Sequence, residues 1–207
     1  MIVTPLSPQD FNLDIAPNDP KRSTGLHMSD IYGRLYEKLE PKRYKHDPDE
    51  DPERRKALLA VGLAVEQYTE RLLVAAGIDA QRPPEFRTPD EYGIAFSPDL
   101  LLYNGGVRGG EIKVTFMSTN GLPETTSRDF PERMSKYLCQ MKVYGHNLEI
   151  PEWVLFGWFL KGDYVKAKGK ADPFLAEFRI FQFTFTAREM QDEYRVLLNF
   201  ARTKGML

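Results

Sequence analysis

The stretch from Ser97 to Lys113 constrains the fold of this 207-residue chain more than any other. Leu100 to Tyr103 is a short apolar run with a proline before it and an asparagine after it, which is typical of a buried strand. Asn104-Gly105 then favours a tight hairpin turn, because both central residues of such a turn take positive φ. Gly109-Gly110 loosens the return, and Glu111 to Met117 is the predicted partner strand. The stretch therefore predicts an antiparallel strand pair at the centre of a sheet.

Three charged side chains lie in this strand pair. Glu111 and Lys113 are two residues apart, so both leave the same face of their strand, and Asp99 begins the other strand. Asp99 shares that face if the numbers of opposed residues sum to an even value, and a sum of 212 places it opposite Lys113. Burying two acids and a lysine is unfavourable unless they pair or bind something. Together they can hold a hard divalent cation through oxygen ligands, which suits hydrolysis of a phosphodiester.

These residues resemble the PD-(D/E)XK nuclease superfamily. Pro98-Asp99 matches its PD element, and Glu111-Ile112-Lys113 matches its (D/E)XK element. Gly62-x-x-x-Glu66 upstream and Gln140-x-x-x-Tyr144 downstream are similar to elements of the RecB-like and lambda-exonuclease-like branch, in the same order. The resemblance spans roughly residues 53 to 145.

This resemblance implies a fold and an activity. The fold is α/β with a restriction-endonuclease-like core, in which a central mixed sheet is flanked by helices at 53–76 and 130–145. The activity is that of a Mg²⁺- or Mn²⁺-dependent deoxyribonuclease, expected to be an exonuclease in phage or recombination DNA processing. DNA is the implied partner. Contacts with a second copy of the chain or with a recombination or replication protein stay open.

The resemblance also implies a role for each matching residue. The metal ligands are Asp99, Glu111 and the carbonyl of Ile112, with Glu66 binding the metal directly or through water. Lys113 orients the attacking water and stabilises developing charge. The remaining predicted residues lie on the helix at 130–145, where Gln140 and Tyr144 position the substrate strand while Arg133 and Lys136 extend a basic path for its backbone.

Composition narrows the class of protein. The net charge is −2 and the pI about 6.0, so DNA binding must use a local basic patch. Cys139 is the single cysteine, which excludes a disulfide framework, a cysteine-rich zinc site and an iron–sulfur cluster. No run of 18 apolar residues and no signal peptide are present, so we expect no membrane contact and a cytoplasmic protein, in the bacterial host if phage-encoded. The sequence contains no phosphate-binding glycine loop, which argues against a built-in ATP motor.

The chain is predicted to form one domain that is preceded by an arm. Residues 1–26 are interpreted as an extended arm, and residues 27–207 as a single nuclease domain. The helix at 53–76 is apolar around much of its circumference and is expected to be largely buried. The other predicted elements are a helix capped by Ser29 and stopped by Pro41, an irregular strand at 85–87 or 93–96, strands at 153–160 and 174–186, and a final helix opened by the capping box Thr186-x-x-Glu189.

Three alternatives remain at this point. In the first, the residues have structural roles only: Glu66 pairs with a basic neighbour, and the polar stripe of the helix at 130–145 faces water. The whole domain is a non-catalytic DNA-binding or assembly module in a second interpretation. In a third, it is an unrelated α/β domain in which Asp99, Glu111 and Lys113 do not converge.

Overall fold

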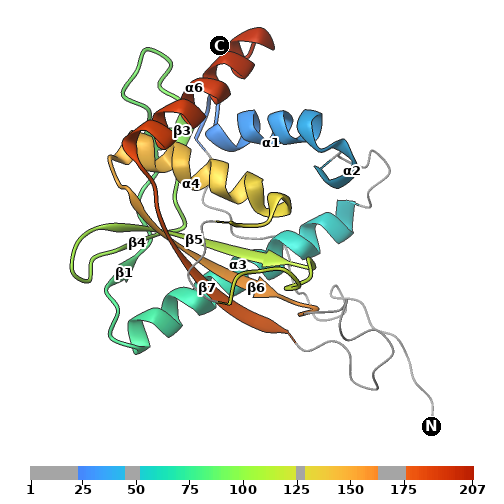
Figure 1. The fold of residues 1–207 in the computed structure, drawn as a ribbon, viewed down its shortest axis with the longest axis vertical. Helices are drawn as coiled ribbons and strands as arrows, with labels where there is room; N and C mark the ends of the chain where they lie inside the picture. The colour runs from blue at the N-terminus through green and yellow to red at the C-terminus, as the bar shows by residue number, and fades with distance from the viewer. Residues whose placement is uncertain (1–22, 45–51, 125–128, 163–175) are drawn as a thin grey trace.

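The computed structural model describes residues 23–44, 52–124, 129–162 and 176–207 (Figure 1). Most of the predicted arm, residues 1–22, lies outside the described residues. The helices are α1 (Met28–Leu39), α2 (Pro41–Tyr44), α3 (Pro52–Ala75), a 3₁₀ turn (Glu132–Met134), α4 (Ser135–Leu148) and α6 (Ala187–Thr203). The strands are β1 (Ala80–Gln81), β2 (Phe86–Arg87), β3 (Ala95–Phe96), β4 (Leu100–Leu102), β5 (Arg108–Thr115), β6 (Glu152–Phe159) and β7 (Glu177–Thr184).

Five strands form the central sheet, in the order β1-β4-β5-β6-β7. The pair β5 and β6 is parallel, and the other three pairs are antiparallel. Helix α4 makes the crossover that a parallel pair requires. The predicted α/β fold with a mixed central sheet and flanking helices is therefore confirmed.

The register of β4 and β5 has the predicted parity. Leu100 opposes Gly110 and Leu102 opposes Arg108, so opposed numbers sum to 210. This sum is even, as expected, but it differs from the value of 212. The register extended by one residue places Asp99 opposite Glu111 instead of Lys113, and all three still share one face of the sheet.

The connection between β4 and β5 differs from the predicted tight turn. Five residues, Tyr103 to Val107, separate the two strands, and positive φ is found at Gly105 and Gly106, not at Asn104. The asparagine instead binds elsewhere: its Oδ1 accepts a hydrogen bond of 2.7 Å from the Asp79 amide. Gly109 and Gly110, predicted to loosen the return, lie inside β5.

Gly109 and Gly110 permit close packing. A Cβ atom at Gly109 would lie 2.5 Å from the ring of Trp153 on β6, and one at Gly110 would lie 3.0 Å from the Leu100 Cβ. Both contacts are tighter than side chains normally make. The glycines therefore bring the neighbouring strands and the buried indole against β5 immediately before Glu111.

The sheet has two differently covered faces (Figure 1). Helices α4, α1 and α6 cover one face, where the larger apolar core contains Trp153, Leu155 and Phe159. Helix α3 crosses the other face, over a smaller core that includes Leu73 and Ile112. Because strand side chains alternate, odd-numbered residues of β5 face α4 and even-numbered residues face α3.

The prediction that the helix at 53–76 is largely buried is wrong. Among its described side chains only Thr69 and Leu73 are buried, whereas Leu58, Leu59 and Val61 are between 44% and 55% exposed. The reason is geometric: α3 touches the sheet along one stripe, and no second layer of described residues covers its outer side. Apolar composition alone did not determine burial here.

Smaller differences concern element boundaries. Both alternative first strands exist, but they pair with each other in a separate two-stranded sheet, and the edge of the central sheet is the unforeseen β1. The first helix begins at Met28 with His27 as its N-cap, not Ser29, because Asp30 accepts a hydrogen bond from the His27 amide. The capping box of Thr186 and Glu189 is present as predicted.

Candidate active site

The charged side chains of the predicted motif converge on one spot. Glu111 and Lys113 leave the same face of β5, and the Lys113 ammonium is hydrogen-bonded to Oε1 of Glu111. Its Nζ also lies 3.7 Å from Oδ2 of Asp99. The same Asp99 oxygen accepts a hydrogen bond of 2.7 Å from the Ile112 amide, which fixes the aspartate against β5. The interpretation in which these residues do not converge is therefore excluded.

Gln140 reaches this cluster from α4. Its side-chain Nε2 donates a hydrogen bond to Oε1 of Glu111, the oxygen that Lys113 also binds. The second carboxylate oxygen of Glu111, Oε2, is buried and has no hydrogen-bond partner among the described residues. Since buried polar atoms are nearly always satisfied, this oxygen is a candidate position for a bound cation or a water.

The cluster perturbs its own ionisation. Burial raises the pKa of Glu111 well above its ordinary value, the charge of Asp99 adds to this, and Lys113 partly offsets it. Burial acts to lower the pKa of Lys113, but Glu111 and Asp99 outweigh it and raise that pKa well above its ordinary value. Lys113 is thus held as an ammonium beside the Glu111 carboxylate, whose negative charge is disfavoured by burial.

Glu66 on α3 lies near the cluster but has a partner of its own. Its Oε2 is 3.4 Å from the Arg82 guanidinium, so the simple ion-pair interpretation is correct for this contact. Burial raises the pKa of Glu66, and the charge of Asp99 raises it further. Glu66 is therefore electrostatically coupled to the predicted metal ligands. Gly62, one turn earlier, has open space around it.

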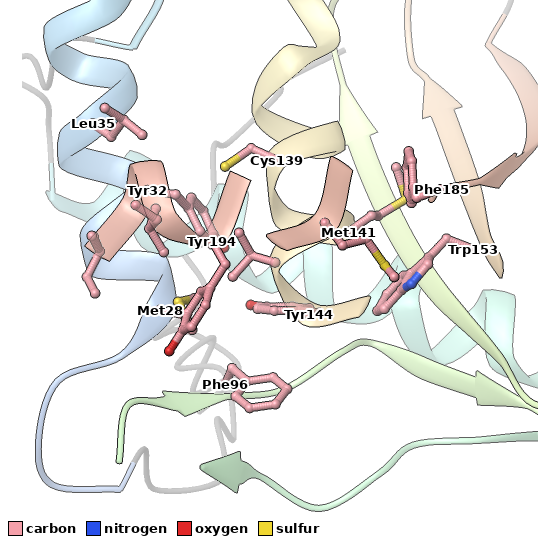
Figure 2. Packing of buried hydrophobic residues seen from close by; sticks show 14 of the residues in the cluster. Met28, Tyr32, Leu35, Phe96, Cys139, Met141, Tyr144, Trp153, Phe185 and Tyr194 are labelled. Atoms are coloured by element: carbon pink, nitrogen blue, oxygen red, sulfur yellow. The ribbon is translucent and has the colours of Figure 1, made fainter. Parts of the chain in front are cut away.

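Tyr144 lies behind Gln140 in the interior. It is 3% exposed and packs against Phe96 and Trp153, with ring centroids 5.3 and 6.2 Å apart (Figure 2). Its hydroxyl interacts by a hydrogen bond with that of Tyr32 on α1. Tyr144 is thus buried among aromatic side chains, and its role in positioning a substrate strand stays a prediction.

Two tyrosines near the cluster escaped the sequence interpretation. Tyr32 is buried on α1 and is influenced by the charges of Lys113 and Glu111. Tyr137 on α4 lies with its ring centroid 5.9 Å from the Lys113 Nζ. The sequence shows both only as members of amphipathic helices. A weak signal existed for Tyr137, which is three residues before Gln140 and therefore shares its helix face.

The two basic residues of α4 behave differently. The Lys136 Nζ lies 4.8 Å from the Tyr44 ring centroid and 5.8 Å from that of Tyr32. Burial lowers the pKa of Lys136, and the charge of Lys113 lowers it further. Arg133 instead donates hydrogen bonds to the backbone carbonyls of Ser118 and Asn120. It anchors that loop, and a phosphate contact stays a prediction.

The donor set fits a hard divalent cation, although it is not a complete ligand sphere. Within the described residues no three histidine, cysteine, aspartate or glutamate side chains lie close enough to hold a metal by themselves. Two features nevertheless favour one: carboxylates from adjacent strands, and the open Oε2 of Glu111. The Ile112 side chain points to the opposite face, and a ligand role for its carbonyl stays a prediction.

Comparison with known proteins places the fold but not the family. No family model and no curated protein matches the sequence. The crystal structure of SSO0001 aligns with 90% of this chain and 79% of its own, at a TM-score of 0.50 and 12% identity. An alkaline exonuclease from Laribacter hongkongensis aligns with 87% of this chain and 89% of its own, at a TM-score of 0.45 and 13% identity. A phage-related exonuclease from Haemophilus somnus 129PT aligns with 85% of this chain and 79% of its own, at a TM-score of 0.48 and 11% identity.

At 12% identity, the likeness to SSO0001 concerns the fold alone. The two exonucleases have TM-scores below 0.5, so they add nothing to the functional assignment. Within the described residues, no helix is both long and apolar enough to cross a membrane.

Proposed function

We propose that this protein is a metal-dependent DNA nuclease that resembles the RecB-like and lambda-exonuclease-like branch of the PD-(D/E)XK superfamily. One observation carries the proposal: Asp99, Glu111 and Lys113 meet on one face of the sheet with an open carboxylate oxygen among them. The expected substrate is DNA, attacked from an end during phage or recombination processing.

Asp99 and Glu111 are the residues that would hold Mg²⁺ or Mn²⁺, with the Ile112 carbonyl and Glu66 as the further candidates. Hard oxygen ligands of this kind match the preference of both ions. A bound ion supplies stabilisation of charge on the phosphate and a lowered pKa of bound water. The raised pKa of Glu111 supports this assignment, since a nearby cation would offset the cost of its buried charge.

Lys113 acts as a charged donor and not as a general base. Its pKa is raised by Glu111 and Asp99, so it keeps its proton at neutral pH. An ammonium in this position orients a water and stabilises negative charge that develops on the phosphate. Gln140 holds Oε1 of Glu111 and thereby leaves Oε2 free to bind a cation.

We assign the attraction of phosphate to Lys136 on α4. Its pKa is lowered by burial and by the charge of Lys113, so a bound phosphate would relieve the repulsion between the two ammonium groups. Since the net charge of the chain is −2, such local positive charge is required for DNA binding.

The second candidate function is a non-catalytic DNA-binding or assembly module of the same fold. The observation that favours it is the ion pairing of Lys113 with both carboxylates, which satisfies the cluster in part without a metal.

A cleavage assay separates the two candidates. Linear and circular DNA, each single- and double-stranded, are incubated with Mg²⁺, Mn²⁺ or EDTA. The nuclease proposal requires cleavage with a metal and none with EDTA, loss of cleavage in Asp99→Asn, and full activity in Asp79→Asn, a control carboxylate that is exposed outside the cluster. Degradation of linear but not circular DNA indicates an exonuclease. A folded wild-type protein that binds DNA and cleaves no form supports the module.

A further inference from the structure

Helix α4 and strand β5 present matching rows of side chains to each other. Along β5 the residues facing α4 are Glu111, Lys113 and Thr115, spaced by two. Along α4, Tyr137 and Gln140 lie three residues apart on one face. Gln140 contacts Glu111, which leaves Tyr137 beside Lys113 and Thr115.

The Tyr137 ring is a further neighbour of the Lys113 ammonium, besides the two carboxylates. The ammonium contacts Glu111 and Asp99, and the ring centroid of Tyr137 lies 5.9 Å away. The Thr115 side chain, on the strand that carries the lysine, lies close enough to the Tyr137 hydroxyl to lower its pKa. A cation near an aromatic face at this distance is attracted by the ring.

This arrangement restricts a flexible side chain. Lysine has four rotatable bonds and high rotamer entropy, and Lys113 remains 22% exposed. With its ring partner absent, the ammonium gains the volume that the ring occupies and turns toward α4. A misplacement of about 1 Å is enough to lower the rate of an enzyme strongly, on the order of 100-fold.

We propose that Tyr137 is a positioning residue whose ring holds the Lys113 ammonium beside Asp99 and Glu111. This inference rests on the proposed function for its catalytic consequence, but the placement of the lysine is a property of the folded chain alone. Tyr137 acts through Lys113 and needs no contact with the substrate.

The structural test requires no activity. The ε-methylene protons of Lys113 are observed by NMR in wild-type protein, assigned through their loss in Lys113→Arg. A ring-current shift is expected in the wild type and in Tyr137→Phe, and its loss is expected in Tyr137→Leu. Leu138→Ala, a change at the next residue of the same helix, should leave the Lys113 signals in place. Signals that are identical in wild type and Tyr137→Leu overturn the proposal.

The kinetic test uses the same variants with the metal-dependent cleavage assay. Tyr137→Leu is expected to lower kcat on the order of 10-fold, with little change in KM, because the interaction acts on the reacting centre. Tyr137→Phe should restore most of kcat, since it keeps the ring. A purely structural role would lower kcat in Leu138→Ala as well, and that result would contradict the proposal.

The two tests fail in different ways. Wild-type protein without cleavage refutes the nuclease and leaves the NMR comparison standing. Active wild-type protein with an unchanged kcat in Tyr137→Leu refutes the positioning role alone.

Discussion

Helices α3 and α4 lie on opposite faces of the same sheet and differ in burial although their overall hydrophobicity is similar. The longer α3 is rich in leucine, valine and alanine, yet Leu59 and Val74 are 55% and 57% exposed. The shorter α4 is no more apolar, yet it buries Cys139, Gln140 and Tyr144.

The number of layers explains the difference. Helix α4 lies between the sheet and the helices α1 and α6, so its side chains are enclosed from two directions. Among the described strands, helix α3 packs against β5 and β1. It also reaches β6 through Thr69, which accepts a hydrogen bond of 3.0 Å from the Trp158 indole. Polar groups buried under α4 are therefore the ones that require a chemical explanation.

The largest expected effect concerns the buried acid under α4. Glu111→Gln keeps the shape of the side chain but removes a charged oxygen ligand, and we expect cleavage to fall at least on the order of 10²–10³-fold. The unfolding temperature should change little, because removal of a costly buried charge and loss of the Lys113 ion pair act in opposite directions. Rates with Mg²⁺ and thermal unfolding are measured together. Glu91→Gln, an exposed control, should change neither quantity, and wild-type cleavage by Glu111→Gln would remove the acid from the mechanism.

The next prediction compares the two helices directly. Met141→Ala on α4 removes a fully buried side chain and should lower the free energy of unfolding by about 2–5 kcal/mol. Leu59→Ala on α3 removes an exposed one and should change it by less than about 0.5 kcal/mol. Chemical denaturation of both variants gives the two values. Equal losses would mean that the outer side of α3 is covered in solution.

A third prediction concerns pH. Burial raises the pKa of Glu111 in the folded state, so as pH rises above the ordinary glutamate range of about 4.3 the unfolded chain loses this proton first. The folded state then binds more protons, and its stability must fall as pH rises toward the raised pKa. The raised pKa of Lys113 acts in the same direction at higher pH.

Melting temperatures across this pH range check the prediction. The decline should be weaker in Glu111→Gln, and Mg²⁺ should reduce it in the wild type because the ion binds the charged carboxylate. A decline of the same slope in wild type and Glu111→Gln, with no effect of Mg²⁺, would place its origin elsewhere.

The smallest effect concerns the outer layer that α4 has and α3 lacks. Thr186 accepts a hydrogen bond of 3.2 Å from the Glu189 amide at the start of α6. Thr186→Ala should cost about 1 kcal/mol of stability. Hydrogen exchange should show the loss of protection in α6 and α4 before α3. Arg188→Ala, in the same exposed turn, serves as the control, and uniform loss across both faces would contradict the layered interpretation.

Much of the site followed from local sequence. The approach of Gln140 to Glu111 was expected from the family resemblance, whereas the even register and the side-by-side placement of Glu111 and Lys113 depend on strand alternation. The capping box of Thr186 and Glu189 is likewise a local pattern. Such features are predictable because neighbours in sequence determine them.

The remainder depends on contacts between distant segments. Burial of α3 was wrongly predicted because composition does not reveal how many layers surround a helix. Tyr32 was missed because only the packing of α1 against α4 brings it near Lys113. The loop at Asn104 differed because its side chain binds the amide of Asp79, which belongs to another segment.

The parallel pairing of β5 with β6 sets the order in which the site is assembled. Glu111 lies opposite Leu155 in this ladder, and the whole of α4 separates the two strands. During synthesis, a chain that has emerged only through α4 has one edge of β5 unpaired and lacks the Trp153 side of its core. Parallel strand pairs form slowly, because a long loop must close, at a cost in entropy, before the contacts between the strands can form. The carboxylate cluster is therefore expected to become enclosed late, once β6 has paired with β5.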